Sequence, residues 1–440
     1  MANSTRVSGA PRRLARLSLT TAAIAVLLVL ATAGLRNSLG LLLVGAAGSA
    51  AGLAGGWWFL THRGVLRWLA GAVVVLAPLV VAVLYARARL IWVVVLFGLL
   101  WAAAIATGRR ALAPREADRP AEYETAPPRH PYLIMNPRSG GGKVGRFRLA
   151  ERARELGACV CLLEGTAADV AGLARQAIRD GADLLGVAGG DGTQALVAGV
   201  AAEHDVPFLV ICAGTRNHFA LDLGLDREDP AAGLDALTDG VELRIDLGSI
   251  GDRTFVNNAS FGAYAAVVRS PAYRGDKVGT TLQLLPDLLA GPAVPRLRLT
   301  VDGTTVDGPQ AVLISNNPYA AGDVAGLGRR PRLDGGVLGV LALRVRGALD
   351  AAGLPSGRGR ARSLTVRTSR AAVVDADLPE VPVGVDGEAV VMPTPVRCVI
   401  RPGALRVRVP RHRPGFRLAR PELDWARLWR LALPSRSATR

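Results

Sequence analysis

Acidic residues are absent from the first 110 residues of this 440-residue chain, which contain 11 arginines. Residues 411–440 hold eight arginines against two acids, so the formal charge of +17 lies at the two ends and the charges of residues 111–410 cancel. Arginines that flank apolar runs suit an anionic membrane surface better than a nucleic acid groove. Aromatic residues make up only 5% of the chain, too few for a surface that stacks single-stranded bases. We therefore expect an anionic membrane surface as a partner and no nucleic acid.

Cysteine is also scarce. The chain has four, Cys159, Cys161, Cys212 and Cys398. The spacing of the first two fits neither a zinc knuckle nor a C-x-x-C redox motif, which excludes both kinds of site. We interpret all four as reduced packing residues of a cytosolic domain.

Four long apolar runs open the chain. They cover residues 17–35, 39–60, 65–85 and 90–107. Each approaches the ~20 residues that a helix needs to cross the hydrocarbon core of a membrane. No ionisable residue lies centrally within a run, which excludes a proton or ion pathway. We expect four transmembrane helices in residues 1–110 that serve as an anchor rather than as a transporter.

The arginines around this region predict its orientation. Four precede the first run, and Arg109, Arg110 and Arg115 follow the fourth. Because positive charge favours the cytoplasmic side, both ends are expected in the cytoplasm. The protein is then a multi-pass protein of the cell membrane with its following domains in the cytoplasm. A cleaved signal peptide is the alternative, and the three further apolar runs disfavour it.

The soluble part begins after residues 111–130, which are rich in Pro, Arg and Glu and are expected to form a linker. From residue 131 to 240, short apolar runs alternate with helical patterns. Strands are expected at 132–135, 159–163, 184–188 and 208–211, and helices at 146–156, 167–179 and 194–203. This alternation predicts an α/β domain with a parallel sheet and ligand loops at the carboxyl ends of its strands.

The pattern changes after residue 240. Alternating runs at 243–250, 296–301, 310–315, 337–345, 363–367 and 405–409 are separated by Asp-Gly turns. They predict a mostly antiparallel β domain, a sandwich or a barrel, in residues 241–410. In the basic tail, residues 411–440, Trp425, Leu428 and Trp429 share one helical face. This helix lies either at the membrane interface or against the protein itself.

Two glycine-rich segments carry the chemistry. They are residues 136–143, NPRSGGGK, and residues 189–193, GGDGT. Each follows an expected strand and precedes an expected helix, where glycines and free N–H groups accommodate a polyphosphate. Asp191 adds a carboxylate where a phosphate-bound magnesium ion would lie. The two segments predict a nucleotide triphosphate site. Lys143 does not complete a P-loop, because the G-x-x-x-x-G-K-[ST] pattern is absent.

The chain resembles the diacylglycerol kinase catalytic family, which includes sphingosine kinases and bacterial YegS-like lipid kinases. Residues 136–140 look like its N-P-x-S-G motif and residues 189–193 match its G-G-D-G-T motif. Residues 214–217 (GTRN) resemble its G-T-x-N element, and residues 386–388 (DGE) resemble its late D-G-E. The resemblance covers roughly residues 130–410. It implies an α/β nucleotide-binding domain followed by a lipid-binding β domain, with ATP in the cleft between them.

The resemblance and the phosphate chemistry together predict site residues, with ATP and Mg²⁺ as cofactors. The residues expected to cradle the phosphates or to orient the loops are Asn136, Ser139, Gly140, Gly189, Gly190, Gly192, Thr193, Thr215 and Asn217. Asp191 is expected to help hold magnesium and to act in catalysis. Glu388 is expected to be the general base toward a lipid hydroxyl, the role that the resemblance suggests.

The chain departs from the family at three places. His218 replaces the Asp that usually follows G-T-x-N, and Gln194-Ala195 replaces a common Asn-Glu pair. Gly335 stands where the second Asp of a late D-D-G turn is associated with a structural magnesium site in bacterial members. Asp334 is the remaining candidate ligand for that metal.

Simpler interpretations stay open for each motif. Residues 189–193 could form a plain strand-to-helix turn with Asp191 as its cap. Asp386 and Gly387 could form a hairpin turn that leaves Glu388 solvated. His218 could be structural or catalytic, and Asp246 and residues 257–258 could support the site.

The sequence favours an ATP-dependent kinase of diacylglycerol or another hydroxylated membrane lipid. One alternative is a kinase of a soluble substrate resembling NAD kinases, which share G-G-D-G-T. The other is a membrane protein that senses nucleotide without turnover. Neither the lipid nor the oligomeric state can be read from the sequence, and a homodimer stays open.

Overall fold

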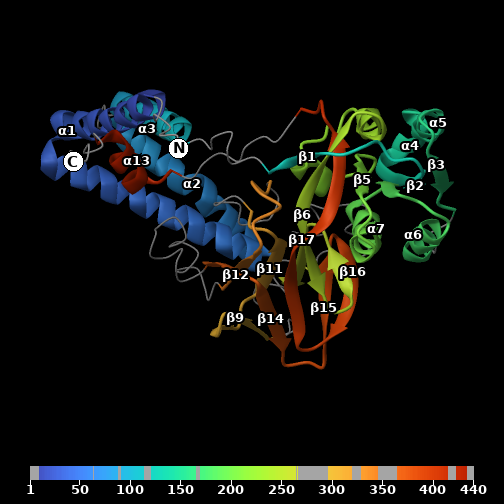
Figure 1. Ribbon diagram of the computed structural model, residues 1–440. Helices are drawn as coiled ribbons and strands as arrows, with labels where there is room; N and C mark the ends of the chain where they lie inside the picture. The colour runs from blue at the N-terminus through green and yellow to red at the C-terminus, as the bar shows by residue number, and fades with distance from the viewer. Residues whose placement is uncertain are drawn as a thin grey trace, which may run out of the picture.

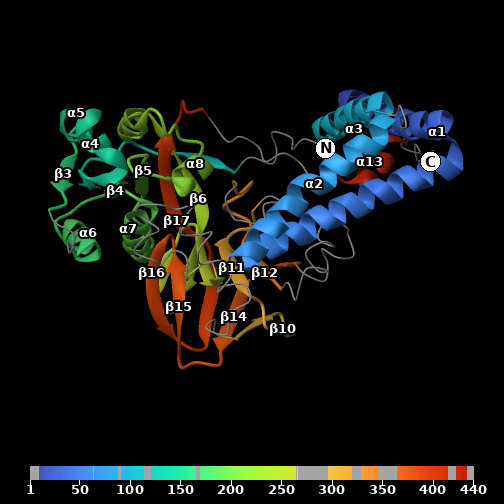
Figure 2. The same ribbon diagram turned by 180° about the vertical axis from the view of Figure 1, so that it is seen from behind.

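The computed structural model describes residues 9–62, 64–87, 91–112, 120–164, 169–263, 265, 296–319, 329–344, 364–414 and 423–433. The apolar N-terminal helices lie to one side of the molecule, and two β-sheets with their covering helices lie to the other (Figures 1 and 2). Parts of the predicted linker and tail lie outside the described residues, as do Arg6 and Arg115 of the orientation argument and the outer ends of the strands expected at 337–345 and 363–367.

Three helices contain the four apolar runs. They are α1 (Gly9–Thr61), α2 (Val65–Arg87) and α3 (Ile91–Ala111). Within them, four segments are long and apolar enough to cross a membrane: Ala10–Thr32, Leu43–Thr61, Val65–Arg87 and Ile91–Ala111. The first two belong to one continuous helix, which the sequence pattern had divided. Large apolar side chains such as Val65 (76% exposed) and Trp68 (73% exposed) face outward, as lipid-facing side chains do.

The helix α13 (Trp425–Ala432) lies among these helices, although it is far from them in the sequence (Figure 1). Leu428 is fully buried in a cluster with Ala15 of α1 and Ala111 of α3. The ring of Trp425 lies 5.7 Å from that of Trp101. The tail helix is therefore docked on the protein, one of the two alternatives. Trp429 remains 60% exposed, so only part of its predicted apolar face is packed.

The parallel sheet follows the predicted alternation. Its strands are β2 (Pro131–Met135), β3 (Cys159–Leu162), β4 (Leu184–Ala188) and β5 (Phe208–Ile211), in the order β5-β4-β2-β3. Helices α6 (Val170–Arg179), α7 (Asp191–Glu203) and α8 (His218–Asp222) pack into the core on one face. The short helices η2 (Ser139–Gly141) and α4 (Lys143–Arg146) precede α5 (Leu149–Glu155), which covers the other face with η3 (Pro230–Leu237). Strand β4 is buried throughout, because helices cover both faces.

The second sheet is antiparallel. Its order is β13 (Leu364–Ser369), β12 (Leu338–Leu343), β11 (Ala311–Asn316), β8 (Asn258–Gly262), β15 (Glu380–Val385) and β16 (Glu388–Pro393). It packs against β9 (Leu297–Val301) and β14 (Ala371–Ala376) through side chains such as Phe261, Leu299 and Val374. The predicted antiparallel domain is thus a sandwich.

Strand β17 (Val396–Pro410) joins the two halves. It lies beside β6 (Gly240–Ile250), β14 and β5 (Figure 2) and pairs antiparallel with β14 and β6 and parallel with β5. In the parallel pair Val407 lies opposite Phe208. Strands β1 (Glu122–Glu124), β7 (Arg253–Phe255) and β10 (Thr304–Asp307) complete an 11-stranded sheet. This sheet crosses the boundary predicted at residue 240, and β1 lies within the predicted linker.

The cysteines differ in their surroundings. All four are free thiols, and Cys212 and Cys398 are buried. Burial raises the pKa of each of these two thiols to about 12, as expected for packing residues. Cys159 is exposed, so its prediction as a packing residue was wrong. It lies on β3, the edge strand of the sheet, where less of the chain covers it.

Candidate active site

Three of the four motifs follow neighbouring parallel strands. Residues 136–140 follow β2, residues 189–193 follow β4 and residues 214–217 follow β5. The carboxyl ends of parallel neighbours lie at one sheet edge, so the three loops meet there. A Cβ atom added to Gly140 would collide with Ala213 O, and one added to Gly214 would lie 2.8 Å from Gly189 O. Glycine is required because the three backbones are in contact.

The first loop is a run of left-handed glycines. Gly140, Gly141 and Gly142 have φ angles of +57°, +72° and +80°. Asn136 Oδ1 accepts the N–H of Arg138 at 3.0 Å, and the half-buried Ser139 begins η2. Consecutive glycine N–H groups in such a turn can line a concave anion site. The Lys143 side chain is bound within the protein, because its Nζ donates to the backbone carbonyl of Arg227 at 2.8 Å.

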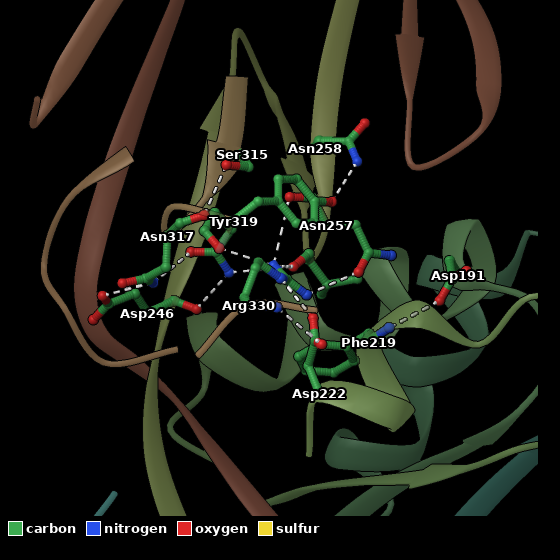
Figure 3. Close-up of polar contacts among 12 residues, drawn as sticks. Asp191, Phe219, Asp222, Asp246, Asn257, Asn258, Ser315, Asn317, Tyr319 and Arg330 are labelled. Atoms are coloured by element: carbon green, nitrogen blue, oxygen red, sulfur yellow. Dashed lines mark hydrogen bonds and ion pairs between the residues drawn. The ribbon is translucent and has the colours of Figure 1, made fainter. Parts of the chain in front are cut away.

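The second loop becomes the first turn of α7. The helix begins at Asp191, so Asp191, Gly192 and Thr193 are helical rather than loop residues. The N-cap is Gly190, which has no side chain, so Asp191 is not the cap that the simpler interpretation required. The half-buried Asp191 side chain accepts the N–H of Phe219 at 3.5 Å (Figure 3). The free N–H groups of this helix end suit a phosphate.

Glu388 reaches this helix end from the second sheet. A Cβ atom added to Gly192 would collide with Glu388 Oε1, so the carboxylate lies against the first turn of α7. Asp386 and Gly387 form the two-residue turn between β15 and β16, with φ angles of +47° and +86°. The hairpin turn of the simpler interpretation is present, and Glu388 is exposed. Its carboxylate nevertheless contacts the G-G-D-G-T motif.

The carboxylate of Asp386 anchors that turn. It accepts the N–H groups of Val256, Asn257 and Asn258 at 2.7, 2.8 and 2.9 Å. Burial raises the pKa of Asp386 to about 7, and the negative charge of Asp191 adds to this effect, while the three N–H groups oppose it. Residues 257–258, predicted as supporting residues, thus hold the D-G-E turn.

The third loop is closed by Asn217. Its Nδ2 donates to Gly214 O at 2.7 Å and its Oδ1 accepts the N–H of Gly214 at 2.9 Å. Asn217 is fully buried with a left-handed φ of +54°, so it orients the loop. Thr215 is exposed beside it, and His218 begins α8 half-buried.

Sequence reasoning missed three residues near these loops. Buried Gln194, which stands where the family commonly has Asn, donates from Nε2 to Gly189 O at 3.0 Å and so supports the second loop. Asp222 and Arg330 form a buried ion pair of 2.7 Å. Burial raises the pKa of Asp222, and the charge of Arg330 opposes the rise. A lone Asp in the apolar run of residues 219–225 was the available signal.

The late turn does not fit a structural magnesium ion. Arg332 donates to both carboxylate oxygens of Asp334, at 2.9 and 3.0 Å. The N–H of Gly335 donates to Asn317 Oδ1 at 2.8 Å, and Asp246 Oδ2 accepts the N–H of Gly336 at 2.6 Å. Over the described part of the chain, no group of three or more His, Cys, Asp or Glu could hold a metal ion. The expectation of a metal at Asp334 is therefore withdrawn, because a guanidinium already neutralises its charge.

Three of these motifs lie in a segment that is similar to known proteins. Residues 130–250 match the model of the diacylglycerol kinase catalytic domain. Diacylglycerol kinases of Mycobacterium tuberculosis (strain CDC 1551 / Oshkosh) and Bacillus subtilis (strain 168) are 34% and 35% identical over 139 and 136 residues. Each match covers 30% of this chain and 44% or 45% of the relative, so the chain spans less than half the length of these relatives.

A solved structure shares the fold. The crystal structure of a candidate diacylglycerol kinase from Bacillus anthracis str. Sterne covers 64% of this chain and 96% of its own, with a TM-score of 0.50 and 18% sequence identity. At that identity the likeness concerns the fold alone. The predicted resemblance is confirmed for residues 130–250, which hold three of the four motifs and match the model of the diacylglycerol kinase catalytic domain. Four apolar helical segments precede them.

Proposed function

We propose that this protein is a membrane-anchored lipid kinase that transfers the γ-phosphate of ATP to the hydroxyl of diacylglycerol or a related membrane lipid. The observation that carries the proposal is the contact between Glu388 and the first turn of α7. It brings a carboxylate beside the N–H groups that are suited to hold phosphates. The names of the relatives support a lipid acceptor.

The residues divide the work of phosphoryl transfer. Transfer needs positioned phosphates, neutralised charge and a base for the attacking hydroxyl. Backbone N–H groups of residues 140–141 and 190–193 hold the phosphates. Gln194 orients the loop that follows β4, and Asn217 orients the loop that follows β5. Asp191 is placed to hold the Mg²⁺ that accompanies ATP, whose charge would stabilise the phosphates. Glu388 accepts the proton of the lipid hydroxyl. The lipid oxygen then bonds to the γ-phosphorus as the bond between that phosphorus and ADP breaks.

The location follows from the apolar helices. Four segments that could cross a membrane keep the kinase where its substrate is, with the catalytic half in the cytoplasm, where ATP is available. The arginines at both chain ends are suited to an anionic lipid surface. These helices disfavour a kinase of a soluble substrate. The approach of Glu388 to α7 disfavours a sensor, because nucleotide binding without transfer needs no base.

The test is an acceptor panel with purified full-length protein in mixed micelles. Labelled phosphate from ATP is followed into diacylglycerol, total membrane lipid or NAD, with Asp191→Ala beside the wild type. We expect label in diacylglycerol or in another membrane lipid, and far less with the variant. Label only in NAD would support the soluble-substrate kinase. Binding of an ATP analogue without label in any acceptor would contradict the proposal and support the sensor.

A further inference from the structure

Arg330 is an arginine in the interior of the protein, where charge is costly unless it is paired. It is 3% exposed. Its guanidinium donates to Asp222 Oδ2 at 2.7 Å and Asn257 Oδ1 at 2.8 Å, and to the carbonyls of Val256 at 2.5 Å and Asn316 at 2.8 Å (Figure 3). The guanidinium N–H groups therefore bind acceptors from three separate segments of the chain, at residues 222, 256–257 and 316.

On one side, Arg330 holds the nucleotide half. Asp222 is the last residue of α8, and its other oxygen accepts the backbone N–H of Arg330 at 3.2 Å. The same short helix follows Asn217 and presents the N–H of Phe219 to Asp191. A shift of Asp222 would therefore move the helix that borders both G-T-x-N and G-G-D-G-T.

On the other side, Arg330 holds the segment that carries the D-G-E turn. It binds the carbonyl of Val256, while Asp386 accepts the N–H groups of residues 256–258. The ring of Tyr319 lies 5.9 Å from the guanidinium, and its hydroxyl accepts from Asn258 Nδ2 at 2.8 Å. Arg330 thus binds residues 256–258 through the carbonyl of Val256, and Asp386 binds them through their backbone N–H groups.

We infer that Arg330 is a positioning residue that sets Glu388 in register with the first turn of α7. The inference deepens the proposed function and rests on it. The buried pair itself is weak evidence for a stabilising role, because apolar pairs of similar volume often replace such pairs without loss of stability. What an apolar pair cannot supply is the fork that grips α8 and residues 256–257 together.

The test compares Asp222→Leu/Arg330→Met with Arg408→Met. The double variant leaves no unpaired buried charge. Arg408 is also a buried arginine (1% exposed), but it donates to Ala236 O at 2.6 Å and Thr125 Oγ1 at 2.7 Å, outside the four motifs. We expect the double variant to fold, with kcat for lipid phosphorylation lowered roughly 100-fold and KM for ATP little changed, as for a small misplacement of reacting groups. Amide exchange at residues 256–258 should quicken. Arg408→Met should keep kcat and this protection.

The outcomes separate the two ideas. A double variant with wild-type kcat and unchanged amide exchange at residues 256–258 overturns the positioning role. So does a loss of kcat in both variants that scales with how far each lowers the melting temperature. Wild-type protein without transfer refutes the proposed function instead, and amide exchange then still decides whether Arg330 holds residues 256–258. If the double variant fails to fold, Arg330→Lys, which keeps the charge without the fork, takes its place with the same expected loss of kcat.

Discussion

Asp191 and Asp334 were both expected to bind magnesium, and their surroundings differ. Asp191 lies half-buried at the start of α7 with one long hydrogen bond of 3.5 Å from Phe219 N–H. Asp334 has both oxygens bound by the fork of Arg332. In the proposed function the first carboxylate accepts a cation that arrives with a nucleotide, whereas the second is already paired with a guanidinium of the chain. The difference teaches that a carboxylate in a motif must also be checked for a cationic partner within the chain before a metal is assigned to it.

The largest contrast is expected between alanine variants of these two residues. Asp191→Ala should lower kcat/KM for ATP roughly 100- to 1,000-fold, the scale of losing one group that stabilises transition-state charge, as an oxyanion-hole donor does. Asp334→Ala should leave kcat/KM nearly unchanged and cost at most ~1 kcal/mol of stability, because Arg332 is 52% exposed. Steady-state kinetics and thermal melts of both variants check this. Equal losses of activity would contradict the distinction.

Gly192→Ala sharpens the account on the Asp191 side. The added Cβ would collide with Glu388 Oε1 and push the carboxylate away from α7. We expect kcat to fall roughly 100-fold, while the melting temperature holds, because alanine favours a helix by up to ~1 kcal/mol over glycine. The control is Gly145→Ala, whose Cβ meets nothing within 4 Å. Wild-type kcat in Gly192→Ala would show that Glu388 does not need its present position.

Asp386 offers a pH test of the same corner. Its folded pKa is raised to about 7, so the folded protein retains a proton that the unfolded chain has lost at the ordinary carboxyl pKa. This stability is present in acid and is lost as pH rises through about 7. Asp386→Asn does not ionise, so its stability relative to wild type should improve from about pH 5 to about pH 8. Chemical denaturation across that range measures it, with the exposed Asp377→Asn as control. A constant difference would contradict the raised pKa.

The smallest effect is expected at the late turn. Since Arg332 supplies the cation there, EDTA should leave the melting temperature of the nucleotide-free protein unchanged, and added Mg²⁺ should not raise it. Arg332→Ala should lower stability by at most ~1 kcal/mol. A melting temperature that falls with EDTA and recovers with Mg²⁺ would reveal a metal at this turn after all.

Much of this architecture was predictable from local pattern. The apolar runs, the strand–helix alternation and the glycine motifs predicted the long apolar helices, the parallel sheet and the sheet edge where three motifs meet, because each depends on residues close in sequence. The pairing of β17 with β5 was not predictable, since Val407 and Phe208 are joined only by the fold. Arg330 was missed for the same reason. Its sequence neighbours are arginines and proline, and its partners lie on α8 and beside β8.

The most direct test of the central claim is a single-turnover measurement with saturating ATP and the accepted lipid. Glu388→Gln is compared with Glu380→Gln, an exposed glutamate at the far end of the same hairpin. The account predicts that Glu388→Gln binds an ATP analogue normally and transfers phosphate roughly 100- to 10,000-fold more slowly, as for loss of a general base, whereas Glu380→Gln matches the wild type. Equal transfer rates for the two variants would contradict Glu388 as the base.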